Sequence, residues 1–367
     1  MKIPLVNNFI WDKQVRVPVY RHSNLFNKDV YTLNVLFQIR DDYKSNLAGD
    51  SIQMLKTKQH IGNMGVNVDV SSSYNISLEK YDVLHIFNVI RAEESYKFVQ
   101  NSLKQNKPYV LSTIYWNMKE YINKDVYTSS TIEWWSKLNN MRKYIILNAS
   151  ALLPNSEIEM QVLRKDFSAN NKYFVIPNCS DWNFYSSSPD SFVSKYGLKD
   201  FILCVGRISY RKNQLALIKA LKDTDYILVF IGRKSNKKYF QKCKDAANQN
   251  VFFISEIKHS ELASAYAAAK VHVLPSWFET PGLASLEAGL AGCNIVTTCK
   301  GSTKEYFKQY AYYCDPSDIE SIKKAVECAY KAPKTDELKE CILNNYMWES
   351  AALKTLEAYR YVLNTKK

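Results

Sequence analysis

The sequence predicts an α/β fold of two doubly wound parallel sheets that face each other across a cleft. Short apolar runs rich in β-branched and aromatic residues alternate with longer mixed segments, and this alternation runs through the chain twice. A chain of 367 residues is also long enough for two cores. The Ser/Pro-rich stretch Ser186–Ser191 lies between the two passes and is the expected linker. We therefore expect one domain over residues 1–190 and a second over 193–349.

Each pass supplies its own strands, with helical segments between them. The helical candidates are Ile52–Met64, Asn213–Leu221, Ser260–Lys270 and Ile319–Tyr330. The expected strands of the first half are Thr32–Ile39, Val66–Val70, Val83–Phe87, Tyr109–Ser112, Ala151–Pro154 and Tyr173–Ile176. Those of the second half are Phe201–Val205, Tyr226–Ile231, Val251–Ile254, Val271–Pro275, Asn294–Thr298 and Ala311–Cys314.

Composition and charge narrow the class of protein. No apolar run approaches the roughly 20 residues that cross a bilayer, and Met1–Tyr20 mixes charged residues into its apolar ones. We therefore expect a soluble, cytoplasmic protein. The formal net charge of +13 is concentrated in residues 191–367, which carry +9 of it. This excess leaves nucleic acid, an anionic membrane surface and a phosphorylated small molecule open as partners.

The loop after the first strand of the second half carries two cations. Gly206 permits a tight turn off the strand, and Arg207 and Lys212 follow on one short loop before a helix. Ligands of doubly wound sheets bind at the carboxyl ends of the strands. A guanidinium fork and a lysine point charge beside a helix N-terminus suit a diphosphate. We expect this loop to bind one, with a solvated basic loop as the alternative.

The strongest local signal is the segment Phe278–Gly289, which follows a predicted strand. Thr280 is expected to cap a helix whose first residue is Pro281. Glu279 precedes this helix and Glu287 lies nearly two turns into it, so the two carboxylates are too far apart to act on one atom. They suit the two ends of an extended ligand, with a phosphate at the helix N-terminus between them. The residues expected to bind it are Glu279, Thr280, Gly282, Leu283 and Glu287.

Three further segments carry weaker signals. Gly49 stands at the first strand-to-helix turn and is expected to lie over the same phosphate, although its loop has few glycines. Asp223 and Asp225 fit a paired-aspartate metal site, but they precede a strand and so lie away from the cleft; no metal site is expected. The basic run Arg233–Lys244 is expected to be a solvated helical face, with contact to anionic lipid as the alternative.

Taken together, these segments resemble the retaining glycosyltransferases of family 4, which have the GT-B fold of two Rossmann-like domains. The likeness covers nearly the whole chain and is strongest over residues 201–330. The loop with Gly206, Arg207 and Lys212 resembles the family's diphosphate loop, and Glu279 and Glu287 resemble its pair of glutamates separated by seven residues. Further likenesses lie at Gly49–Asp50, Leu153–Glu157, Ile176–Asn178, Glu305 and Trp348, where the last helix, 350–367, is expected to cross back onto the first domain.

The resemblance implies a role for each residue of the site. Arg207 and Lys212 would neutralise the leaving diphosphate of a nucleotide sugar. Glu287 would bind the ribose hydroxyls, and Glu279 would hold hydroxyls of the donor sugar. The first domain would bind the acceptor. Because fixed cations stabilise the leaving group, we expect no metal and no cofactor beyond the nucleotide-sugar substrate.

The wall that receives the acceptor departs from the family pattern. Many members carry a histidine after the fourth strand, where this chain has Ser112–Trp116. Tyr115 or Trp116 is the expected replacement. His85, in the third strand, is the only histidine near that edge and is either functional or a satisfied core residue. Cys179 also stands where many members have glycine.

By this resemblance, the chain is a retaining transferase that moves a sugar from a nucleotide diphosphate to a glycan or lipid-linked acceptor. Surface polysaccharide synthesis, at the inner face of the membrane, is the expected setting. A sugar phosphorylase or nucleotide-sugar epimerase on the same fold is one alternative. A basic nucleic-acid-binding protein is another, but the sequence has no helix-turn-helix, zinc module or RNA-binding strand signature, so we expect no nucleic acid partner.

Overall fold

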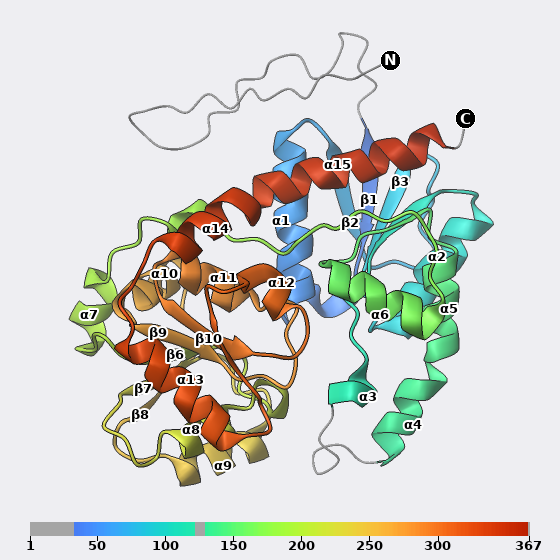
Figure 1. Cartoon of the computed structure of the whole chain (residues 1–367). Helices are drawn as coiled ribbons and strands as arrows, with labels where there is room; N and C mark the ends of the chain where they lie inside the picture. Colours follow the sequence, from blue (N-terminus) through green and yellow to red (C-terminus); the bar gives the residue numbers. More distant parts are fainter. Residues whose placement is uncertain (1–32, 122–128, 366–367) are drawn as a thin grey trace, which may run out of the picture.

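A computed structural model of the chain describes residues 33–121 and 129–365. Two parallel β-sheets lie side by side, each covered by helices on both faces (Figure 1). This is the doubly wound α/β architecture predicted from the alternating apolar runs. The N-terminal stretch Met1–Tyr20, which we interpreted as no signal peptide, lies outside the described residues.

The first sheet contains five parallel strands, and its spatial order reverses between the first and third strands of the chain. Its central strands are buried because apolar side chains on both faces meet helices. In spatial order the strands are β2 (Asn67–Ser71), β1 (Asn34–Gln38), β3 (Val83–Phe87), β4 (Tyr109–Ser112) and β5 (Ala151–Leu152).

Helices cover both faces of this sheet. α1 (Gly49–Asn63) packs on one face through Met54 and Ile61. The opposite face is covered by α2 (Ala92–Lys104), α5 (Asn139–Leu147) and α6 (Glu157–Phe167). Two shorter helices, α3 (Met118–Tyr121) and α4 (Ser129–Lys137), follow β4.

The predicted strand Tyr173–Ile176 is not a strand of this sheet, and that prediction was wrong. Only Tyr173 forms a bridge, to Leu152 of β5. The N–H of Ile176 still donates to the carbonyl of Pro154. Pro154 on one side and Pro177, the residue after Ile176, on the other have no N–H to donate. The ladder of hydrogen bonds therefore cannot continue past this point.

The second sheet contains all six strands predicted for the second half. Its order reverses between β6 and β9, the first and fourth strands of this half. In spatial order the strands are β11 (Tyr312–Cys314), β10 (Asn294–Thr298), β9 (Val271–Leu274), β6 (Ile202–Val205), β7 (Leu228–Ile231) and β8 (Val251–Ile254).

This order decides where a ligand can bind. In doubly wound sheets the loops that leave the two strands at the point of reversal diverge and expose the carboxyl edge. The loop after β6 carries Gly206–Lys212, and the loop after β9 carries Phe278–Gly282. The topology therefore brings the two strongest sequence motifs to one edge.

The helices of this half form a layer on each face. One layer contains α7 (Asp190–Tyr196), α10 (His259–Ala268), α11 (Leu283–Leu290), α12 (Thr303–Phe307) and α14 (Glu337–Asn345). The other contains α8 (Gln214–Ala220), α9 (Lys237–Ala246) and α13 (Ile319–Lys331). Among the described residues, no helix is both long enough and apolar enough to cross a membrane.

The chain passes from the first half to the second earlier than the predicted linker. Cys179 packs in the core of the first sheet, whereas Phe184 packs in that of the second. Within the stretch Ser186–Ser191, Asp190 already begins α7. Phe192 in that helix is fully buried in the second core. Core packing thus places residues 184–190 with the second sheet, a few residues before the boundary expected at 190.

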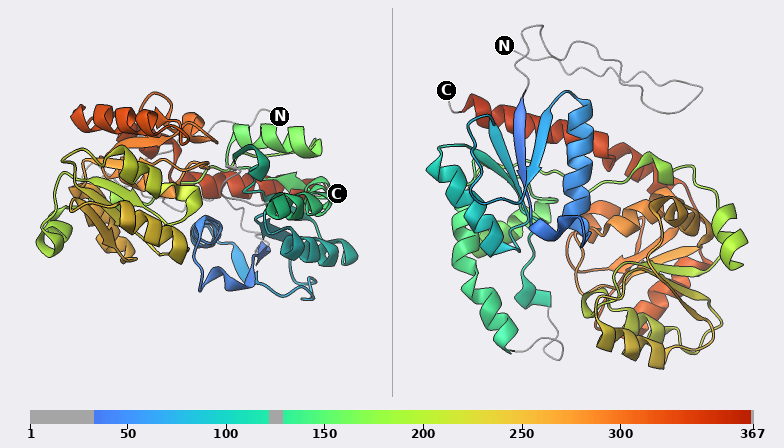
Figure 2. Two further views of the ribbon diagram at one scale, coloured as in Figure 1. Left: turned by 90° about the horizontal axis from the view of Figure 1, so that it is seen from below. Right: turned by 180° about the vertical axis from the view of Figure 1, so that it is seen from behind.

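The chain returns to the first half at its end. Ser180 forms a parallel bridge with Met347, so the two crossing segments run side by side. The second crossing leads into α15 (Trp348–Asn364), which packs on the face of the first sheet that α1 also covers. Figure 1 and Figure 2 show α15, in red, spanning from the second half onto the first. This is the crossing helix that the sequence indicates.

Candidate active site

The loops after β6 and β7 meet through two glycines. Gly206 and Gly232 both have positive φ, at 147° and 149°. A Cβ added to Gly232 would lie 2.3 Å from the carbonyl oxygen of Gly206, so only glycine permits this approach. The contact sets Arg207 and Arg233 next to each other at the carboxyl edge of the sheet.

Arg207 lies exposed at this edge, within a positive field. Arg40, Arg211 and Arg233 act on its guanidinium as neighbouring cations, and Asp50 acts as the neighbouring anion. No hydrogen bond ties the Arg207 guanidinium to another of the residues that the structure describes. An anion placed beside it would be attracted by several cations at once.

Lys212 and Glu279 form a buried ion pair that joins the two loops at the point of reversal. The Nζ of Lys212 lies 2.5 Å from Oε1 of Glu279, and the two side chains are 13% and 5% exposed. Arg211 lies 3.4 Å from the same carboxylate oxygen and donates to the carbonyl of Phe278. The N–H of Trp277 in turn donates to the carbonyl of Arg211. The loops are therefore held as one unit.

The ion pair fixes the charge of both partners. Burial raises the pKa of Glu279, but the neighbouring Lys212 and Arg211 outweigh it and bring that pKa to about 2. Burial lowers the pKa of Lys212, and the carboxylate of Glu279 opposes this. Glu279 is therefore ionised at neutral pH and acts as a hydrogen-bond acceptor and a fixed negative charge rather than as an acid.

Helix α11 begins two residues later than predicted. Gly282, not Thr280, occupies the N-cap position, with φ at +91°. Its carbonyl accepts the first helical bonds, from Ser285 and Leu286. The Thr280 side chain makes no capping bond, and its carbonyl accepts instead from the amide of Asn178. The predicted cap was wrong because the positive φ needed at the helix start favours glycine.

The start of α11 still faces the ion pair. A Cβ added to Gly282 would lie 3.3 Å from Oε2 of Glu279. Leu283 follows in the first turn, where backbone N–H groups have no acceptor within the helix. The structure thus brings Lys212, Glu279, Gly282 and Leu283 together, with Arg207 on the adjoining loop. Such an N-terminus favours a negative group.

Glu287 lies further along α11 and has two partners that the sequence did not indicate. The hydroxyl of Tyr266 donates to Oε2 at 3.0 Å, and Nε2 of His259 lies 3.4 Å from Oε1. The hydrogen bond with Glu287 raises the pKa of His259. Leu283 and Glu287 are four residues apart, a rise of about 6 Å. His259 follows β8 at the same sheet edge, and that position was the signal that could have found it.

Gly49 belongs to a loop of the first half that reaches the second. Arg40 holds this loop closed, because its guanidinium donates to both carboxylate oxygens of Asp50, at 2.9 and 3.1 Å. Gly49 itself opens α1, with nothing within 4 Å of an added Cβ. The guanidinium of Arg233 lies 3.5 Å from the carbonyl of Ser45 on the same loop. The loop therefore adjoins the basic edge of the second sheet.

Of the three residues considered for the acceptor side, His85 and Tyr115 are buried in the core and Trp116 is partly exposed. His85 is buried, with Nδ1 2.7 Å from the Tyr359 hydroxyl and Nε2 2.8 Å from that of Ser112. It is a satisfied core histidine that ties α15 to the sheet, and burial lowers its pKa to about 3. Tyr115 is also buried and donates to Asp166. Trp116 is only half-buried and stacks on Phe278 at 5.3 Å, so it is the aromatic residue that borders the site.

The other weak sequence signals lie apart from this edge. Asp223 and Asp225 precede β7, and Thr224 between them closes a turn after α8. No group of three or more His, Cys, Asp or Glu side chains gathers as a metal site among the described residues. In the basic run, Lys234 and Lys242 lie over the rings of Phe240 and Tyr210.

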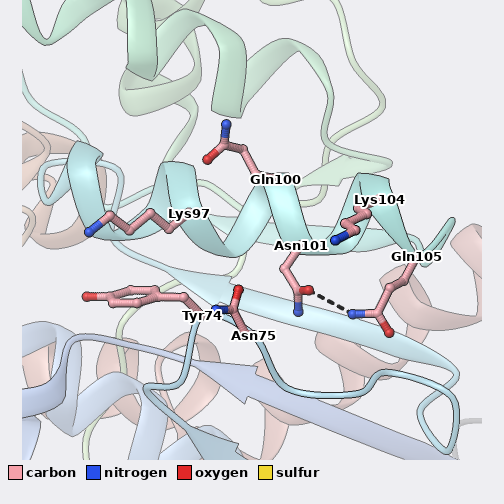
Figure 3. Close-up of a pocket in the computed structure, with 7 residues that line it drawn as sticks. All are labelled: Tyr74, Asn75, Lys97, Gln100, Asn101, Lys104 and Gln105. Atoms are coloured by element: carbon pink, nitrogen blue, oxygen red, sulfur yellow. Dashed lines mark hydrogen bonds between the residues drawn. The ribbon is translucent and has the colours of Figure 1, made fainter.

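A groove of about 730 Å³ lies away from the site, between α2 and the loop after β2 (Figure 3). Lys97 covers the ring of Tyr74 there, at 4.7 Å. Gln105 donates to Asn101 and to the carbonyl of Ile76. The side-chain amides of Asn101 and Gln105 are thus bonded within the protein, and the groove holds none of the predicted site residues.

Comparison with known proteins relates the segment that carries this edge to a family. Residues 191–348 match the family described as Glycosyl transferases group 1. This segment, in the second half of the chain, is therefore similar to the group 1 glycosyl transferases. The matched segment contains both loops of the reversal point and all of α11.

The chain is also similar to individual known proteins. It is 26% identical to an uncharacterized glycosyltransferase of Methanocaldococcus jannaschii over 189 residues, which are 47% of this chain and 48% of that protein. The match thus spans about half the length of this curated relative. Sucrose-phosphate synthase from Thermosynechococcus elongatus aligns with a TM-score of 0.76 at 17% identity, over 91% of this chain and 100% of that one.

A second solved structure is that of Anabaena Alr3699/HepE in complex with UDP-glucose. It aligns with a TM-score of 0.64 at 15% identity, over 91% of this chain and 99% of that chain. At such identities the likeness concerns the fold. The two-sheet fold of this chain is the GT-B fold expected from the sequence.

Proposed function

We propose that this chain transfers a sugar from a nucleotide-diphosphate-sugar donor to a glycan or lipid-linked acceptor. The observation that carries the proposal is the Lys212–Glu279 pair at the start of α11, inside the matched family segment. It combines a fixed cation, a fixed carboxylate and free helix amides within one site. A solved neighbour of the same fold binds UDP-glucose, which supports a nucleotide-sugar donor.

The site's groups suit the parts of such a donor. Arg207 and Lys212 would neutralise the diphosphate, with the amide of Leu283 donating to it. The Oε2 of Glu279, on the side of Gly282, would accept from hydroxyls of the sugar. Glu287, about 6 Å further along α11, would accept from the ribose hydroxyls. Tyr266 would hold its carboxylate in place, because the tyrosine hydroxyl already donates to it.

In the transfer, the bond between the anomeric carbon and the diphosphate oxygen breaks, and that oxygen keeps the electron pair. The acceptor hydroxyl oxygen forms the new bond to the anomeric carbon, and its proton passes to the leaving diphosphate. Arg207 and Lys212 stabilise the negative charge as it develops, without reorganisation. We propose that these fixed cations make a divalent metal unnecessary.

We also propose that the anomeric configuration is retained. Inversion requires a free base on the acceptor side of the sugar. Asp50 is bound by Arg40, and Glu159 of α6 accepts hydrogen bonds from Thr113 and from two backbone amides. Among the described residues on that side, these carboxylates are already engaged. The arrangement therefore favours a reaction in which the leaving group itself takes the proton.

The proposed acceptor is part of a surface polysaccharide pathway at the cytoplasmic face of a membrane. The exposed lysines of α9, Lys237, Lys238, Lys242 and Lys244, would contact anionic lipid there. Vesicles with and without phosphatidylserine would test this contact. Binding that persists after these four lysines are replaced by alanine would contradict it.

The test of the activity is release of nucleoside diphosphate from a panel of nucleotide sugars, with and without candidate acceptors. Release that requires an acceptor is expected. Sugar 1-phosphate formed from glycan and phosphate would indicate a phosphorylase instead, and a changed sugar with no diphosphate released would indicate an epimerase. Tight binding of homopolymer nucleic acid at physiological salt, without any sugar transfer, would favour the nucleic-acid alternative.

A further inference from the structure

The N-terminus of α6, in the first half, is capped by a glutamate of the second half. Oε1 and Oε2 of Glu305, on α12, accept from the backbone N–H groups of Glu157 and Ile158 at 2.9 and 3.1 Å. The N-cap residue of the same helix, Ser156, pairs its hydroxyl with that of Ser302 at 2.7 Å. A carboxylate on free helix amides is a charge-assisted contact that favours this placement.

On the second-half side, the residues before α12 hold the loop that carries Glu279. The N–H of Ser302 donates to the carbonyl of Glu279 at 3.0 Å. Gly301 forms a bridge with Glu279, and a Cβ added to Gly301 would lie 2.2 Å from the same carbonyl. Any shift of Ser302 therefore moves the backbone of Glu279.

On the first-half side, the first turn of α6 holds residues 113–116, the segment after β4 that forms the wall of the site on this side. The buried carboxylate of Glu159 accepts from the hydroxyl of Thr113 and from the backbone N–H groups of Tyr115 and Asn155, the latter two at 2.7 Å. Trp116, the next residue along this wall, stacks on Phe278, the residue before Glu279. The contacts thus form a closed ring that returns to the Glu279 loop.

We propose that Glu305 is a positioning residue for sugar transfer. By capping α6, it sets the wall 113–116 at a fixed distance from the Glu279 loop. The bound acceptor is thereby held at a fixed position relative to the donor sugar. Glu305 acts through α6 and contacts neither substrate. Its catalytic part rests on the proposed function, whereas the coupling between the two loops stands on the contacts alone.

The coupling is tested by hydrogen exchange on the full chain. In Glu305→Ala, the amides of residues 157–158 are expected to exchange faster, and so are those of peptides covering 113–116 and 279–282. Glu305→Gln keeps one carbonyl acceptor and should show a smaller increase. The matched control is Glu320→Ala, an exposed glutamate on α13 of the same half, which should leave all three peptides unchanged. Faster exchange at 157–158 alone, with the two loops unaffected, would overturn the proposal.

The catalytic part is tested by separating turnover from binding. Glu305→Ala should lower kcat for acceptor transfer by about tenfold or more, while the Kd for nucleoside diphosphate stays within about twofold of the wild type. Glu305→Gln should fall between. A kcat equal to that of the wild type, or a nucleotide affinity that falls in parallel, would overturn the positioning role. If the wild type transfers no sugar at all, the proposed function fails and the exchange experiment alone decides the coupling.

Discussion

The Nζ of Lys212 lies 2.5 Å from Oε1 of Glu279, in a pair that is almost closed to solvent. The lysine comes from the loop after β6 and the glutamate from the loop after β9, so one contact joins the two loops at the reversal of the sheet. The roles implied by the family resemblance gave the lysine to the diphosphate and the glutamate to the sugar. In the structure, each of the two side chains is also the counterion that holds the other in place.

This pair predicts strong non-additivity in stability. Removing either partner leaves a buried charge without its counterion, which costs roughly 3–5 kcal/mol. Removing both avoids that cost in part. Denaturant unfolding of Lys212→Ala, Glu279→Ala and the double variant should therefore show a double variant that is less destabilised than the sum of the single ones. Strictly additive losses would mean that the pair is not a unit.

Turnover should depend on the type of cation and not on a metal. Lys212→Ala is expected to lower kcat by about a hundredfold or more, because a fixed donor to the leaving group is lost. Lys212→Arg should rescue it poorly, since Lys212 is enclosed by Gly206, with its Cε 3.4 Å from an added Cβ there. The measurement is transfer rate in excess chelator. Activity that chelation abolishes and Mg²⁺ or Mn²⁺ restores would contradict metal independence.

Loss of Glu287 and loss of Glu279 should affect different quantities, the first nucleotide affinity and the second turnover. Glu287→Ala is expected to weaken binding of every nucleoside diphosphate by roughly ten- to a hundredfold, because ribose is common to all of them. Glu279→Ala should lower turnover with a smaller change in that affinity. Calorimetric titrations of both variants, beside the exposed control Glu320→Ala, would show the difference. An equal loss of affinity in both would refute this division.

His85 predicts a pH dependence of stability. Its pKa is about 3 in the folded chain and about 6.5 when unfolded, so the unfolded state binds more protons between these values. The stability it contributes is complete above pH 6.5 and declines as the pH falls toward 3. Between pH 7.5 and pH 5 the wild type should lose about 2 kcal/mol more free energy of unfolding than His85→Phe. Equal losses in the two proteins would show that His85 does not titrate in this way.

Features set by local sequence were predictable. Apolar runs gave every strand of the second sheet, and residues that follow strand ends, such as Arg207 and Glu279, lie at one edge as expected. Helix α11 was predicted, but its cap was not, because the positive φ of Gly282 depends on how the loop leaves β9. The predicted linker lies a few residues after the point, between Cys179 and Phe184, where the chain passes from one core to the other.

Features set by contacts between distant segments were not predictable. Glu305 matched a family position, but nothing local indicates that it caps a helix nearly 150 residues earlier in the chain. The partners of Glu287, Tyr266 and His259, come from α10, and only the packing of α10 against α11 brings them there. The sequence left His85 as either functional or structural, because its partner, the hydroxyl of Tyr359, lies on α15 at the far end of the chain and hydrogen-bonds to Nδ1 only in the folded structure.

The most direct test of the central claim is a calorimetric titration of the purified full chain with UDP, GDP, ADP and dTDP. The comparison is between the double variant Arg207→Ala, Lys212→Ala and a charge-matched control, Lys237→Ala, Lys238→Ala, on the exposed basic face of the same half. We predict that the wild type and the control bind one of these nucleotides with affinities within about threefold of each other. The double variant should bind it at least about a hundredfold more weakly. Equal weakening in both double variants, or binding that survives the loss of Arg207 and Lys212, would contradict the assignment of this edge as the nucleotide-sugar site.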